Sequence, residues 1–62
     1  MKYDEWETKL IEALAVNFGM SQAESASYVA DCGAEWWGES FADGQSPENA
    51  ALEELNAAAE HL

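Results

Sequence analysis

Acidic side chains at helical spacing in the middle of the chain are the residues with the clearest potential chemistry. A helical projection of this segment at 100° per residue places four of them on one side, namely Glu24, Asp31, Glu35 and Glu39. The last three follow one another at i, i+4, where like charges destabilise a helix by roughly 0.2–0.5 kcal/mol per pair. No lysine or arginine follows Lys9 to offset this cost. Such a row can attract a basic surface, and its spacing resembles that of phosphates along a nucleic-acid strand.

The same row has a second interpretation, because runs of charge most often form the solvated face of a soluble protein. Net charge of one sign keeps small proteins apart in solution without any partner. The acids therefore predict either a partner-facing surface or a solubilising one.

Aromatic residues accompany the acids. Tyr28 projects onto the acidic side of the same helix, and Trp37 lies about 100° from Trp36, so the two indoles cannot face the same neighbour. We expect Trp6, Trp36 and Phe18 in the core. Trp37 then either packs against another helix or serves as an exposed anchor, and Trp37 with Phe41 could instead close a homodimer.

Chemistry of other kinds has little support in the sequence. Cys32 falls on the predicted core face without a neighbouring base, and His61 stands near the end of the chain. Cys and His do not occur at metal-ligand spacing, and the Asp43-Gly44 turn lacks the repeated acids of an EF-hand loop. We predict no catalytic activity, no metal and no cofactor.

Composition bounds the class of protein. Thirteen acidic residues against two lysines give the 62-residue chain a formal net charge of −11. Because phosphate backbones and anionic lipids would repel it, direct binding to nucleic acid or to a membrane is not expected. A content of 48% hydrophobic residues, including three tryptophans, is too apolar for a disordered acidic tail. We predict one folded domain over residues 1–62.

Targeting signals are not evident. A single cysteine cannot form an internal disulfide, and the first residues do not combine a basic start with an apolar stretch as a signal peptide does. A run of about 20 apolar residues, as a membrane span requires, is also missing. These features predict a cytoplasmic protein.

Three helices at about residues 3–18, 21–41 and 46–61 would position these side chains in a compact all-α bundle. Gly19 suits the end of the first helix, Ser21 with Glu24 forms a capping box, and Ser46 with Pro47 suits the start of the third. The expected inner face of the third helix includes Ala51, Leu52 and Leu55.

Two glycines interrupt the middle helix. Because the apolar stripe of Val29 and Cys32 continues in phase through Trp36, we expect one long helix. A break at Gly33 or Gly38 is the alternative.

Two resemblances bear on function. The loop Phe18-Gly19-Met20-Ser21 and the helix start Ser46-Pro47-Glu48-Asn49-Ala50 resemble the arrangement in ubiquitin-associated domains, which are three-helix modules that bind ubiquitin through an apolar patch. The middle segment is longer than in that family, so no binding residue is carried over. In size, charge and helical pattern the whole chain is also similar to small acidic bacteriophage proteins, which bind and block host enzymes, some by imitating DNA.

These observations together predict a small acidic protein-interaction protein. It would act as an inhibitor or nucleic-acid mimic on a basic protein surface, for example that of a nucleic-acid-processing enzyme. Its binding residues would be Glu24, Asp31, Glu35 and Glu39, with Tyr28 or Trp37 as anchors. The alternative is a structural or adaptor module that self-associates through exposed aromatics.

Overall fold

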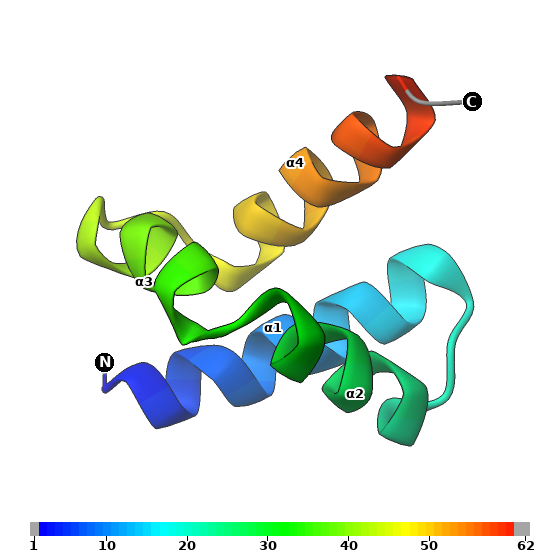
Figure 1. The fold of residues 1–62 in the computed structure, drawn as a ribbon, viewed down its shortest axis with the longest axis horizontal. Helices are drawn as coiled ribbons and strands as arrows, with labels where there is room; N and C mark the ends of the chain where they lie inside the picture. Colours follow the sequence, from blue (N-terminus) through cyan, green and yellow to red (C-terminus); the bar gives the residue numbers. More distant parts are fainter. Residues whose placement is uncertain (1, 61–62) are drawn as a thin grey trace.

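A computed structural model describes residues 2–60, with side chains as far as residue 58, and shows four α-helices in this range. They are α1 (Tyr3–Phe18), α2 (Gln22–Cys32), α3 (Ala34–Ala42) and α4 (Pro47–Glu60). Helix α1 lies along one side of the molecule. Helix α4 starts near α3 and runs toward the opposite end of the molecule (Figure 1). The all-α prediction is confirmed, but the count of three helices is wrong.

The first helix matches its predicted bounds. Its buried side chains, Trp6, Leu10 and Leu14, recur at four-residue spacing and so form one apolar stripe. Gly19 ends the helix in the left-handed region with φ 67°, which glycine adopts without steric cost.

Side-chain capping hydrogen bonds define where α2 and α4 begin. The Ser21 hydroxyl accepts from the Glu24 backbone N–H at 3.1 Å, and the Glu24 carboxylate accepts from the Ser21 N–H at 3.0 Å. The Ser46 hydroxyl accepts from the Asn49 N–H at 3.1 Å, directly before Pro47. The predicted continuation of this last helix to His61 lies outside the described residues.

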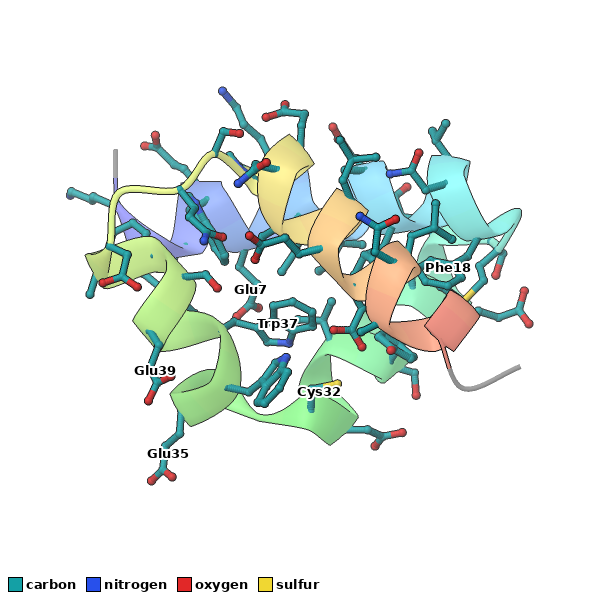
Figure 2. The ribbon with its side chains drawn as sticks, turned by 90° about the horizontal axis from the view of Figure 1, so that it is seen from above. Glu7, Phe18, Cys32, Glu35, Trp37 and Glu39 are labelled. Carbon is teal, nitrogen blue, oxygen red and sulfur yellow. The ribbon has the colours of Figure 1, made fainter. Side chains whose placement is uncertain are left out.

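The middle segment is two helices rather than one. Gly33 has φ 88° and ψ 152°, a conformation essentially restricted to glycine, and it separates α2 from α3. The chain changes direction between Cys32 and Glu35, which Figure 2 labels on either side of the break. The prediction of one helix over residues 21–41 is therefore wrong, and the alternative of a break at Gly33 is confirmed.

The core lies where α1 meets the other helices. Its buried apolar members are Trp6, Leu10, Leu14, Val29, Trp37, Ala50 and Ala51. The two alanines let α4 approach α1 closely. Leu52, expected on the inner face of α4, is instead 50% exposed.

Buried polar groups connect the helices. The Trp6 indole N–H donates to the Gln45 carbonyl oxygen at 2.8 Å, and the buried Ser25 hydroxyl donates to the Ile11 carbonyl oxygen at 2.6 Å. These two bonds attach α1 to the loop before α4 and to α2, and they leave the donors satisfied within the core.

Over residues 2–60, no helix has both the length and the apolar character that crossing a bilayer requires.

Candidate protein-binding surface on α3 and α4

Two of the predicted binding acids stand on α3. Glu35 and Glu39 are exposed, one helical turn apart, and their carboxylates point away from the body of the protein (Figure 2). Asp31 is also exposed, but it lies on α2 before the break at Gly33. The continuous row of three acids at i, i+4 does not form, because the backbone turns between Asp31 and Glu35.

Glu24 lies apart from the α3 acids and has a local structural role. Its carboxylate closes the capping box, and the backbone and side-chain hydrogen bonds with Ser21 lower the pKa of this carboxyl. The charge also lies at the helix N-terminus, where it is favourable. Its position fits helix capping better than contact with a partner.

The prediction that Trp36 lies in the core is wrong, whereas the alternative that Trp37 packs against another helix is confirmed. Trp37 is only 2% exposed, whereas Trp36 is 59% exposed. The break at Gly33 resets the helical phase, so the stripe that passes through Val29 continues with Trp37 and not Trp36. Trp37 therefore cannot be the exposed anchor, and Phe41 packs edge-on against Tyr3 and Trp6.

Tyr28 does not face outward with the acids. It is half-buried, packs near Phe18, and donates from its hydroxyl to the Glu54 carboxylate on α4. Burial and then this hydrogen bond raise the pKa of Tyr28. Burial, followed by the nearby Glu54 charge, also raises the pKa of the Cys32 thiol, which disfavours the reactive thiolate. This cluster joins α2 to α4 and is not an exposed anchor.

A groove of about 320 Å³ lies between α3 and α4. The groove is lined by two tryptophans, two alanines, one serine and three glutamates, namely Trp36, Trp37, Ala50, Ala57, Ser40, Glu39, Glu53 and Glu54. Glu39 comes from α3, and Glu53 and Glu54 come from α4, so the two helices together supply the charge. Among the described residues, no three His, Cys, Asp or Glu side chains gather closely enough to hold a metal ion.

Sequence reasoning missed Trp36, Glu53 and Glu54 as surface partners of Glu39. The available signals were Gly33, which can reset the helical phase, and the adjacent pair of acids in the last helix.

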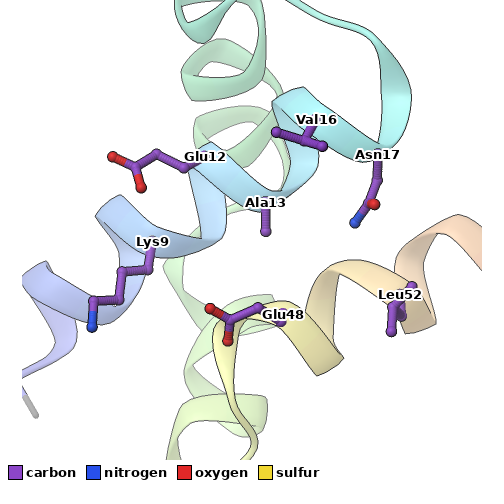
Figure 3. A pocket seen from close by; sticks show the side chains of 7 residues that line it. All are labelled: Lys9, Glu12, Ala13, Val16, Asn17, Glu48 and Leu52. Atoms are coloured by element: carbon purple, nitrogen blue, oxygen red, sulfur yellow. The ribbon is translucent and has the colours of Figure 1, made fainter.

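A second groove, of about 500 Å³, lies between α1 and α4 (Figure 3). Val16, which is 82% exposed, and the half-exposed Leu52 supply its apolar surface. Lys9, Glu12 and Glu48 add charges of both signs.

Comparisons of the chain with models of protein families, with curated proteins and with solved structures gave no match.

Proposed function

We propose that this chain is a small, non-catalytic protein-interaction protein that binds a basic surface on another protein. In this role it acts as an inhibitor or nucleic-acid mimic, and a nucleic-acid-processing enzyme is the kind of partner whose basic groove it fits. The proposal concerns the side of the molecule formed by α3 and the facing turns of α4.

The observation that carries the proposal is the uncompensated charge of this side. Glu35, Glu39 and Glu53 are exposed, and the sequence has no lysine or arginine after Lys9. A field of one sign accelerates association with a basic partner and weakens as salt rises. Two carboxylates at i, i+4 on α3 retain part of the phosphate-like spacing, although Asp31 stands on another helix.

The test begins with the protein immobilised and exposed to a cell lysate at low salt. Retained proteins are eluted by a salt step and identified. A second column carries Glu35→Gln/Glu39→Gln, and a third carries Glu12→Gln/Glu48→Gln in the groove between α1 and α4. Both double variants change the formal charge from −11 to −9, because each substitution removes one negative charge.

We expect the same basic protein on the wild-type and Glu12→Gln/Glu48→Gln columns and much less of it on the α3-variant column. A protein retained equally by both variants would bind through overall charge alone, against the proposal. Displacement of duplex DNA or RNA from the identified partner would then establish mimicry.

A second candidate is a structural or adaptor module that self-associates. The exposed Val16 and Leu52 favour it, because they line one groove and their burial would be favourable. In this second candidate we propose α1 and α4 as the self-association surface in place of Trp37 and Phe41, since Trp37 is buried and Phe41 packs against α1.

Salt separates the two candidates. Added salt screens repulsion between two copies of charge −11 and promotes a dimer, but it weakens attachment to a basic partner. Sedimentation at low and high ionic strength distinguishes them: a dimer that grows with salt and is lost on Val16→Ser supports the second, and a monomer throughout excludes it.

A further inference from the structure

We infer that the groove between α3 and α4 binds an arginine side chain of the partner protein. The inference rests on the proposed function, because it specifies which group of a basic surface this groove takes.

The aromatic part of the groove is one exposed and one fixed indole. Trp37 donates from Nε1–H to the Val29 carbonyl oxygen at 3.1 Å and forms a rigid wall. Trp36 meets it edge to face, with ring centroids 6.5 Å apart and planes at 82°, and 59% of Trp36 stays exposed. An exposed indole face attracts a cation placed over it.

The carboxylates give this groove its charge. Glu53 accepts a 3.4 Å hydrogen bond from the Gln45 side-chain amide, and Glu54 accepts from the Tyr28 hydroxyl. Each ionised carboxylate can accept several hydrogen bonds, so these contacts fix the side chains and leave acceptor capacity. Glu39 lines the same groove from α3, and its exposed carboxylate points outward (Figure 2).

Arginine suits this combination better than lysine. A guanidinium is planar, so it can stack on an indole while its N–H groups donate to carboxylates in a fork, whereas an ammonium is a compact and strongly hydrated charge. A second copy of the chain cannot supply this group, because its sequence has no arginine. Charge complementarity therefore points to a different protein.

The test uses blocked six-residue peptides of arginine and of lysine as probes, titrated calorimetrically into the whole protein at one low salt concentration. We expect tighter binding of the arginine peptide. Trp36→Ala should lower its affinity about 3- to 30-fold, as expected for loss of a cation–π contact, and should remove most of the preference over lysine. Trp36→Phe should retain part of that preference.

Glu39→Gln and Glu35→Gln form a matched pair on α3, since both are exposed and each loses one charge. Only Glu39 lines the groove, so Glu39→Gln should weaken arginine-peptide binding more. Circular dichroism checks that each variant keeps its helices.

The outcomes separate the inference from the proposed function. Equal, salt-sensitive binding of both peptides, unchanged by Trp36→Ala, would overturn the arginine groove and leave the acidic interaction surface standing. Failure of the wild-type protein to bind either peptide would overturn both.

Discussion

The indole N–H of Trp37 donates to the carbonyl oxygen of Val29, so a side chain of α3 is bonded to the backbone of α2. The same oxygen accepts from the Gly33 backbone N–H at 3.3 Å. The bond holds Trp37 in the core and thereby leaves its neighbour Trp36 on the surface, above the groove between α3 and α4. Burial of one indole thus determines exposure of the next.

Loss of this bond should destabilise the protein. Trp37→Phe removes the donor and part of the buried volume, and we expect the free energy of unfolding to fall by about 1–3 kcal/mol. Trp36→Phe, at the exposed neighbour, should change it by less than about 0.5 kcal/mol. Urea unfolding followed by circular dichroism measures both, and equal effects would contradict the assignment of the two indoles.

Gly33 and Gly38 should respond to alanine in opposite directions. Gly33 has φ 88°, so Gly33→Ala should cost about 1–3 kcal/mol through backbone strain, although no atom lies near the added methyl group. Gly38 lies inside α3 with open space beside it, so Gly38→Ala should stabilise by about 0.5–1 kcal/mol. The urea midpoints of the two variants check this, and a stabilising Gly33→Ala would favour one continuous helix.

Ser25 joins α2 to α1 through its buried hydroxyl. Ser25→Ala should lower the free energy of unfolding by about 0.5–1.5 kcal/mol, because the bond to the Ile11 carbonyl oxygen is lost. Ser27→Ala is the control, since Ser27 is exposed on the same helix. Chemical denaturation of both variants measures the difference, and a neutral Ser25→Ala would show that this bond contributes little.

Tyr28 should make the protein sensitive to alkali. Burial and the bond to Glu54 raise the pKa of its phenol, so the folded state keeps the proton when the unfolded chain loses it near pH 10. This contribution is complete below about pH 10 and is lost as the pH rises further. Tyr28→Phe should therefore lose less stability than wild type between about pH 9 and pH 11. Unfolding measured at both values tests this, and identical losses would contradict it.

Local signals predicted the helix ends well. Gly19, the capping box of Ser21 and Glu24, and the Ser46-Pro47 start depend on neighbouring residues alone, so sequence reasoning could place them. The break at Gly33 was harder to predict, because a helix tolerates an interior glycine. Only the packing of the whole fold decides whether this glycine continues the helix or adopts a positive φ that ends it.

The residues of the candidate site could not be predicted without knowing whether the middle helix breaks at Gly33. Once Gly33 separates α2 from α3, the helical phase changes and Trp37 replaces Trp36 in the core. Glu53 and Glu54 joined the site only because α4 packs across α1 and so lies beside α3, and this contact between segments distant in sequence cannot be read from periodicity.

Affinity for the captured partner across a range of ionic strength tests the central claim most directly. We predict that wild-type binding weakens steadily as salt rises, that Glu35→Gln/Glu39→Gln binds more weakly and with a smaller salt dependence, and that Glu12→Gln/Glu48→Gln stays closer to wild type. An affinity that ignores both salt and the α3 substitutions would show that the carboxylates of α3 do not bind the partner.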